Sequence, residues 1–305
     1  MKRTLFICLA VLGISVLRPA VAEIFQQKVE LYAGDIPNAI RTDNPGVVHD
    51  ERFNDQFVIG ISKPSLTAYL PEGKDKASSA VVICPGGGYF GVSAIKEGQE
   101  VAERFAENGI AAFVLHYRMP SPETMNNPDT GPLQDLQQAL AVVKSRAEKW
   151  HINPDHIGVM GFSAGGHLAA TAATHYQKPV LSSLTTELVT PDFQILVYPV
   201  ISMQSGITHQ GSRDLLLGNP ALEARVDAFS NEKRVSGDTA PAYIVHANDD
   251  QAVVVDNALE YYNALRAHDV SVQMLLLQEG GHGFGMRHPV DWFDGVLQWV
   301  TARSN

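Results

Sequence analysis

Short apolar runs alternate with amphipathic helical patterns along the chain from about residue 56 onward. The apolar runs, which we expect to be strands, lie at 65–70, 80–84, 110–117, 156–160, 193–198, 242–247 and 271–277. The expected helices lie at 95–108, from 132 onward, at 164–176, at 254–268 and at 289–303. Strands that alternate with helices are typical of a mostly parallel sheet covered by helices on both faces. The pattern therefore predicts an α/β fold.

Two segments interrupt this alternation. Residues 23–55 are mixed in polarity and contain turn residues, which predicts an extended arm or an added antiparallel strand pair. Residues 201–238 form a polar, glycine-bearing insertion late in the sheet. Long insertions in compact domains are often functional, so 201–238 is a candidate lid or substrate wall, and a plain surface excursion is the alternative.

The first 22 residues have the pattern of a secretory signal peptide. Two basic residues precede an apolar run at 5–17, and the small residues at 20 and 22 suit a cleavage site. The run is shorter than the roughly 20 residues of a membrane-spanning helix, which makes a retained anchor the weaker interpretation. We therefore expect residues 1–22 to be removed, residues 23–305 to form one domain, and the product to be secreted or periplasmic without a membrane anchor.

Composition and charge exclude several classes of partner and cofactor. The 305 residues are 45% hydrophobic and carry a net charge of −10, with no basic block that could bind nucleic acid. Cys84 is the only cysteine outside the signal segment, so no intramolecular disulfide is expected. No cluster of His, Cys and Asp has the spacing of metal ligands, and we expect neither a metal nor another cofactor. The sequence does not indicate an oligomeric state.

The pentapeptide Gly161-Phe162-Ser163-Ala164-Gly165 is the strongest chemical signal. It stands between an expected strand and an expected helix, where a strained turn can lift a serine hydroxyl above a sheet. Bulkier residues in place of the two glycines would collide with the neighbouring strand and helix. The motif predicts that Ser163 is a nucleophile, against the plainer interpretation of Ser163 as a helix cap in a glycine-rich turn.

A serine nucleophile requires a base, and His282 is the best candidate among the eleven histidines. It lies in the glycine-rich loop at 280–285, directly after the last expected strand. His167 follows Ser163 by four residues in one helix and should be a packing residue. His288 lies beyond the loop, at the start of the last helix, and is a lesser candidate.

The base requires an orienting carboxylate, and an acidic pair follows the expected strand at 242–247. Functional groups collect at such carboxyl ends of parallel strands. Asp250 is favoured because the next helix begins soon after it, which leaves Asp249 to cap or brace the turn. The order Ser163, Asp250, His282 is that of the α/β hydrolases among serine hydrolases.

An acyl-transfer site also requires donors for the oxyanion of its tetrahedral intermediate. The loop after the strand at 80–84 reads Pro85-Gly86-Gly87-Gly88, in the expected place for an oxyanion hole. We predict that the N–H groups of Gly87, Gly88 and Ala164 are the donors. The glycines are not followed by the Lys-Ser/Thr of a phosphate-binding loop.

Taken together, five segments resemble the α/β-hydrolase carboxylesterases related to hormone-sensitive lipase, and more narrowly the secreted bacterial acetyl esterases grouped with acetyl xylan esterases. The segments are CPGGGY at 84–89, LHYR at 115–118, GFSAGGHLA at 161–169, HANDDQAVV at 246–254 and GGHGFG at 280–285. The resemblance runs from about 56 to 303. It implies that the acid of an Asp-x-x-Val pattern, here Asp250, belongs to the triad.

Two positions depart from the pattern of these relatives. Pro85 stands where lipases usually have histidine, which favours the sugar esterases of the group. Val254 stands where related esterases often have proline. The resemblance implies a secreted serine esterase that removes acetyl or other short acyl groups from carbohydrate such as xylan, or from small esters, while the residues themselves identify no sugar contact.

Three other functions are compatible with parts of this pattern. A broad-specificity carboxylesterase or lipase is the nearest, although the polar insertion at 201–238 is unlike a large apolar lid. A prolyl-oligopeptidase-like peptidase shares the triad order but usually carries a large β-propeller, for which 305 residues leave no room. A catalytically inactive binding protein is disfavoured because every expected reactive group is present.

Overall fold

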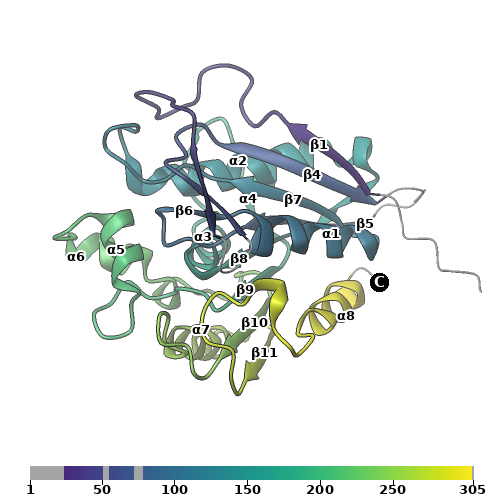
Figure 1. The fold of residues 1–305 in the computed structure, drawn as a ribbon, viewed down its shortest axis with the longest axis vertical. Coiled ribbons are helices and arrows are strands. Elements are labelled where there is room, and N and C mark those ends of the chain that lie inside the picture. Colours follow the sequence, from purple (N-terminus) through teal and green to yellow (C-terminus); the bar gives the residue numbers. More distant parts are fainter. Residues whose placement is uncertain (1–23, 51–54, 72–77, 304–305) are drawn as a thin grey trace, which may run out of the picture.

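The structure is a computed structural model that describes residues 24–50, 55–71 and 78–303 (Figure 1). The expected signal peptide lies outside the described residues. In the described part, no helix is long and apolar enough to cross a membrane.

An eight-stranded sheet runs through the molecule (Figure 1). In their order across the sheet, the strands are β1 (Ile24–Val29), β4 (Ser65–Pro71), β7 (Ala111–His116), β5 (Ser78–Cys84), β8 (Ile152–Phe162), β9 (Gln194–Val197), β10 (Ala242–Ala247) and β11 (Val272–Leu277). The first two pairings, β1 with β4 and β4 with β7, are antiparallel. All other neighbours are parallel, which confirms the predicted α/β sheet.

Helices cover both faces of this sheet, as the alternating pattern predicts. Apolar side chains of α2 (Gly131–Ser145), α3 (Ser163–Thr174) and α7 (Asp256–Ala267) pack in one buried cluster. Those of α1 (Glu100–Glu107) and α8 (Phe293–Arg303) pack in a second. The sheet is therefore buried on both sides, which explains why its central strands are continuous apolar runs.

The N-terminal segment contributes to two sheets. β1 joins the edge of the main sheet, and β2 (Gly46–Asp50) forms an antiparallel pair with β3 (Asp55–Ile59), which lies almost entirely beyond the 23–55 segment. β6 (Gly91–Ser93) completes this small sheet. Because β6 follows the glycine-rich loop directly, the small sheet supports one side of that loop.

Several element boundaries differ from the predicted ones. The expected helix at 95–108 begins with a π-helical turn, η1 (Ile95–Gln99), before α1. The last helix begins at Phe293 instead of 289, because Asp291 caps it by accepting the N–H groups of Phe293 and Asp294. Short helices also form between the larger elements: η2 (Pro128–Thr130), η3 (Glu148–Trp150), α4 (Thr186–Val189) and η5 (Gly285–Arg287).

The insertion at 201–238 is partly helical. It contains α5 (Gln210–Leu217), α6 (Glu223–Phe229) and η4 (Asn231–Lys233), and in Figure 1 α5 and α6 lie together at one side of the molecule. The side chain of His209 caps α5 by accepting the N–H of Ser212. α5 and α6 are each about two turns long, which is too short for a clear periodic pattern in the sequence.

A buried ion pair lies beside the carboxyl end of β7. Arg118 and Asp135 have fully buried side chains that meet at 2.8 Å between Nη2 and Oδ1. Tyr32 donates to Asp135 at 2.7 Å, and Arg118 donates to the carbonyl of Pro37 at 3.0 Å. The pair therefore joins β7, α2 and the N-terminal arm.

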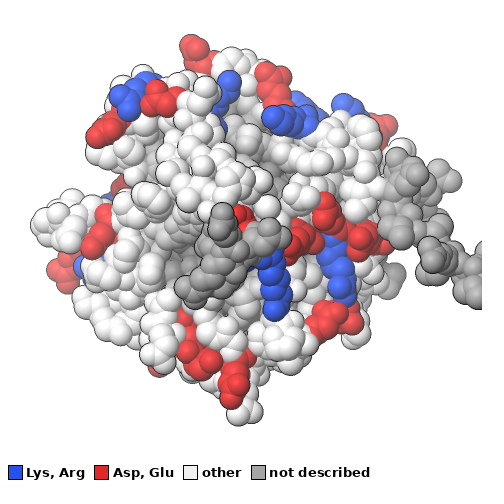
Figure 2. All heavy atoms as spheres, in the orientation of Figure 1, with Lys and Arg blue, Asp and Glu red and all other residues white. Residues whose placement is uncertain are grey.

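Charged side chains on the surface are mixed in sign. On the face drawn in Figure 2, Lys and Arg lie among Asp and Glu instead of forming one basic patch. Arg104, for example, pairs with Asp291 and Asp294, and Arg287 pairs with Glu100.

Candidate active site

Ser163 lies at the junction of β8 and α3, at the carboxyl end of a central strand. Its φ of 52° is left-handed, an uncommon and strained conformation for a residue other than glycine. A Cβ on Gly161 would come within 2.1 Å of the carbonyl oxygen of Gly165, and one on Gly165 within 2.1 Å of that of Cys84. The two glycines are therefore required by close backbone contacts with the helix and with the neighbouring strand.

The structure brings Ser163, His282 and Asp250 together. The Nε2 atom of His282 lies 2.9 Å from Ser163 Oγ, and its Nδ1 atom lies 2.6 Å from Asp250 Oδ2. Since a carboxylate can only accept, Nδ1 carries the proton and Nε2 is free to accept one from the serine hydroxyl. The three groups come from the ends of β8, β10 and β11, which are parallel strands on one side of the sheet.

Asp250 is held by more than His282. Its Oδ1 atom accepts the N–H groups of Ala252 and Val253, each at 2.9 Å. His246 Nε2 lies 3.3 Å from its Oδ2 atom. Burial alone would raise the pKa of Asp250, but the hydrogen bonds of His246 and His282 outweigh it and hold the pKa well below 3.8. The carboxylate is therefore ionised at neutral pH.

The other candidates from the sequence lie elsewhere. Asp249 is exposed and accepts the N–H of Gly281 at 2.8 Å, so it braces the histidine loop. His167 is fully buried and bonded at 2.8 Å to the hydroxyl of Tyr89, which confirms a packing role away from the Ser163 hydroxyl. His288 Nε2 donates to the carbonyl of Glu279 at 2.8 Å.

Two of the three predicted oxyanion donors, Gly87 and Gly88, lie in a loop in which the Gly86 and Gly87 carbonyl groups are already engaged. The carbonyl of Gly86 accepts the N–H of Ser93 at 2.9 Å, and that of Gly87 accepts the N–H of Phe90 at 3.0 Å. In a planar trans peptide the N–H points opposite to the carbonyl, so these bonds fix the directions of the Gly87 and Gly88 N–H groups. Neither N–H donates to another group within the described residues.

The third predicted donor is Ala164, which follows Ser163 in the first turn of α3. N–H groups in a first helical turn have no partner within the helix. The N–H of Ala164 is therefore available beside the serine. The donor roles of Gly87, Gly88 and Ala164 stay predictions.

A cavity of about 410 Å³ opens over these groups. It is lined by Ser163, His282, Gly283, the three loop glycines Gly86, Gly87 and Gly88, and by Asp55, Phe57, Ser93, Lys96, Glu97 and His209. His209 comes from the insertion at 201–238 and lies over the glycine loop, since a Cβ on Gly88 would be 3.9 Å from its ring. The insertion therefore contributes one wall residue to this cavity.

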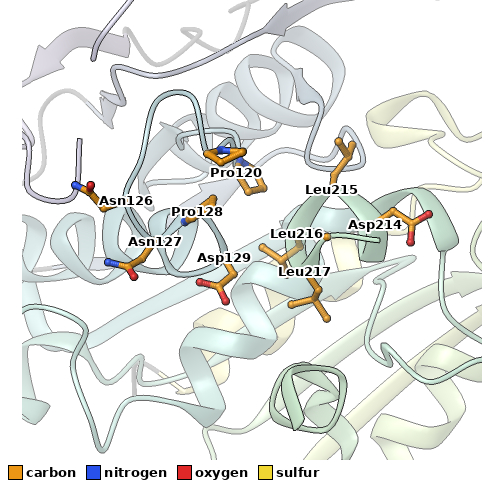
Figure 3. Close-up of a pocket in the computed structure, with 11 residues that line it drawn as sticks. Pro120, Asn126, Asn127, Pro128, Asp129, Asp214, Leu215, Leu216 and Leu217 are labelled. Atoms are coloured by element: carbon orange, nitrogen blue, oxygen red, sulfur yellow. The ribbon is translucent and has the colours of Figure 1, made fainter. Parts of the chain in front are cut away.

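A second cavity, of about 510 Å³, lies between α5 and the chain segment before α2 (Figure 3). Its two acidic side chains have other partners, because Asp129 pairs with Arg225 and Asp214 accepts from Gln210 at 2.7 Å. None of the predicted site residues lines it. Among the residues that the structure describes, no group of three or more His, Cys, Asp or Glu could hold a metal ion.

Two residues beside the site had no signal in the sequence. Glu97 is buried and accepts hydrogen bonds from the N–H of Gly86 and from the hydroxyl of Tyr198, both at 2.8 Å. The ring of Tyr198 stands edge-on to His282 with centroids 4.9 Å apart. An acidic residue in an amphipathic helical pattern is normally exposed, and only its burial shows that Glu97 belongs to the site.

Comparisons with known proteins place this fold in a family. A family model, BD-FAE, matches residues 66–265. The chain is 35% identical over 250 residues to an acetylxylan esterase from Xylanibacter ruminicola. This alignment covers 80% of the chain and 49% of the esterase. It is 32% identical over 238 residues to an endo-1,4-beta-xylanase B from Butyrivibrio fibrisolvens, covering 76% of this chain and 36% of that protein. The chain thus spans half or less of the length of these two curated relatives.

A solved structure shares both fold and sequence. The acetyl ester-xyloside bifunctional hydrolase from Caldicellulosiruptor lactoaceticus is 32% identical, with a TM-score of 0.70 over 79% of this chain and 88% of that one. A carboxylesterase from Lactobacillus plantarum, 22% identical, has the same fold, with a TM-score of 0.68 over 92% of this chain and 98% of that one. The chain is therefore an α/β hydrolase and belongs to the BD-FAE family.

Proposed function

We propose that the protein is a serine esterase that hydrolyses short acyl esters, acetyl esters above all. The observation that carries this proposal is the hydrogen-bonded chain from Ser163 Oγ through His282 to Asp250. It opens into a cavity beside the N–H groups of Gly87 and Gly88, which have no partner within the described residues. A hydroxyl, an imidazole and a carboxylate in this arrangement generate a nucleophile for acyl transfer.

The geometry gives each residue one step. Ser163 Oγ attacks the ester carbonyl while His282 Nε2 takes its proton, and the buried charge of Asp250 stabilises the imidazolium. The N–H groups of Gly87, Gly88 and Ala164 receive the negative oxygen of the tetrahedral intermediate. His282 then protonates the departing alcohol, and water attacks the acyl-enzyme with the same base. The products are the alcohol, the carboxylic acid and free Ser163.

The substrate we propose is acetylated carbohydrate such as xylan, or a smaller ester of the same kind. The names of the acetylxylan esterase and of the bifunctional acetyl ester-xyloside hydrolase support this choice. From the signal pattern at 1–22 we infer that the enzyme is secreted or periplasmic. An enzyme outside the cytoplasm can reach a polymeric substrate.

His209 supports a hydroxyl-bearing substrate. Its Nδ1 atom accepts from the hydroxyl of Ser212 at 2.8 Å and from the N–H of the same residue, so the proton of the neutral ring is on Nε2. Burial lowers the pKa of His209, which keeps the ring neutral. Nε2 has no hydrogen bond within the described residues and can donate to a sugar hydroxyl. We therefore interpret the insertion at 201–238 as a substrate wall.

The nucleophile is tested with Ser163→Ala and a short-chain aryl ester. Hydrolysis should be abolished while the melting temperature stays unchanged, because His282 is the one hydrogen-bond partner of the hydroxyl in the described part of the chain. Activity within tenfold of the wild type would reject the assignment.

The substrate is tested with a panel of acetylated xylan, acetylated pectin, feruloyl esters and medium-chain aryl esters. Preference for the acetylated polysaccharides supports the proposal, and preference for medium-chain esters would favour the broad carboxylesterase instead. His209→Ala should lower kcat/KM for acetylated xylo-oligosaccharides about tenfold more than for an aryl acetate, as expected for one lost hydrogen bond. Gln210→Ala, in the adjacent exposed residue, is the matched control. Equal losses on both substrates would show that His209 does not contact the sugar.

A further inference from the structure

Glu97 is a buried carboxylate that the proposed mechanism does not use. It lies in η1, 3% exposed, beside the cavity that holds Ser163 and His282. Its Oε2 atom accepts the N–H of Gly86 at 2.8 Å. Its Oε1 atom accepts the hydroxyl of Tyr198, also at 2.8 Å. Both oxygens are thus engaged, one of them by the loop that carries the predicted oxyanion donors.

Tyr198 continues the connection to the opposite side of the site. Its oxygen accepts the N–H of Gly285, in the histidine loop, at 2.9 Å. Its ring packs edge-on against His282 at 4.9 Å and against Phe284 at 4.6 Å. An unbroken path of hydrogen bonds therefore runs from Gly86 through Glu97 and Tyr198 to Gly285.

Every donor on this path is satisfied when Glu97 is ionised. The N–H of Gly86 and the hydroxyl of Tyr198 each donate to one carboxylate oxygen, which leaves the tyrosine oxygen to accept from Gly285. A protonated Glu97 would face at least one of these donors with its own proton. On balance burial raises the pKa of Glu97 above its usual value, although Lys96 and the bonds to Tyr198 and Gly86 favour the carboxylate. A buried carboxyl group costs stability, but its hydrogen bonds can hold the surrounding loops in one arrangement.

We propose that Glu97 is a positioning residue that fixes the oxyanion loop and the histidine loop relative to each other across the nucleophile. The inference rests on the esterase function proposed above. Glu97 does not contact the substrate, because both of its carboxylate oxygens already accept hydrogen bonds, from the Gly86 N–H and the Tyr198 hydroxyl.

The contacts around Gly86 explain why the position of this loop is sensitive. A Cβ on Gly86 would lie 2.7 Å from Glu97 Oε2 and 2.9 Å from Ser163 Cβ, so the loop backbone fits tightly between the carboxylate and the nucleophile. The next N–H along the chain is that of Gly87, a predicted oxyanion donor. Loss of the bond to Glu97 would leave the peptide group of the Gly86 N–H held only through its carbonyl, which accepts the hydroxyl of Tyr117. The support of the adjoining Gly87 donor would loosen. Misplacement of a catalytic group by about 1 Å can cost about 100-fold in rate.

The experiment compares Glu97→Gln, Tyr198→Phe, the double variant and Ser163→Ala on a short-chain aryl acetate. Glu107→Gln is the matched control. It makes the same chemical change at a residue that is exposed on the adjacent helix α1. For each protein kcat, KM and the melting temperature are measured. We expect Glu97→Gln and Tyr198→Phe each to lower kcat roughly 10- to 100-fold with KM within about threefold. The double variant should match the more impaired single variant, because both changes break one path.

A purely structural role would lower the melting temperature and leave kcat of the folded protein intact. Folded Glu97→Gln and Tyr198→Phe that both keep kcat within threefold of the wild type would overturn the proposal. So would losses that multiply in the double variant, since the two residues would then act separately. If Glu97→Gln does not fold, Tyr198→Phe decides alone, because it removes one oxygen and keeps the Glu97–Gly86 bond. An active Ser163→Ala, or a wild type inactive on every ester, would reject the esterase function itself.

Discussion

Replacement of Asp250 by asparagine changes one atom at the centre of the candidate site. One carboxylate oxygen accepts two backbone N–H groups, from Ala252 and Val253, and the other accepts the Nδ1–H of His282 at 2.6 Å. The amide oxygen of an asparagine must stay with the two backbone donors, because its NH₂ group cannot accept from them. The NH₂ group would therefore face His282.

This orientation reverses the protonation of the imidazole. A donor opposite Nδ1 favours the tautomer with the proton on Nε2, which then cannot take the proton of Ser163. The variant also loses the negative charge that stabilises the imidazolium. In serine hydrolases this change lowers kcat about 10⁴-fold, which corresponds to about 5 kcal/mol in the activation barrier.

The assay is the steady-state hydrolysis of a short-chain aryl acetate, with Asp249→Asn as the matched control. Asp249 is exposed and accepts only backbone N–H groups, so an asparagine oxygen replaces it and the rate should stay within about threefold. A folded Asp250→Asn with kcat within tenfold of the wild type would refute the reasoning. A larger loss for Asp249→Asn would move the acid of the triad.

Three further predictions concern stability. Asp135→Asn should lower the free energy of unfolding in urea by about 3–5 kcal/mol, because it leaves the buried guanidinium of Arg118 without its partner; a loss below about 1 kcal/mol would contradict this. Burial lowers the pKa of His167 to about 4, so this residue takes up a proton between pH 6.5 and 4 only in the unfolded chain; it should contribute about 3 kcal/mol to the fall in stability over that range, and an equally steep fall in His167→Gln would disprove this contribution. Gly161→Ala should destabilise the fold by about 1–3 kcal/mol, since its Cβ would lie 2.1 Å from a carbonyl oxygen, whereas Gly237→Ala, with its Cβ 3.8 Å from the nearest atom, should be nearly neutral by thermal unfolding.

The residues expected in the candidate triad are brought together by topology that the sequence already contains. Ser163, Asp250 and His282 each follow an apolar run, and parallel neighbouring strands place such positions at one edge of a sheet. The glycines beside Ser163 could be predicted for the same reason, because the close approach of strand and helix leaves no room for side chains. These features depend on local pattern and on strand order.

The features that could not be predicted depend on contacts between distant segments. Glu97 and Tyr198 are 101 positions apart, and neither stands in a motif. Asp135 lies in a helix where an acidic residue is normally exposed, and only the approach of Arg118 explains its burial. The two helices of the insertion are too short for a periodic signal. The positions of these residues and helices are determined by contacts with distant parts of the chain, which a single sequence does not reveal.

The strand that precedes the proposed base has one neighbouring strand in the part of the sheet that the structure describes. Among the described strands β11 lies at the edge of the sheet and pairs with β10, and only one of its six residues is fully buried. Opening of an edge strand costs less than opening of the sheet centre, so the imidazole would be lost first if its own strand alone held it. Instead, Asp249 after β10 and Tyr198 after β9 each hold a backbone N–H of the His282 loop. The proposed proton acceptor is thus tethered to interior strands, and hydrogen exchange in its loop should be slower than in β11.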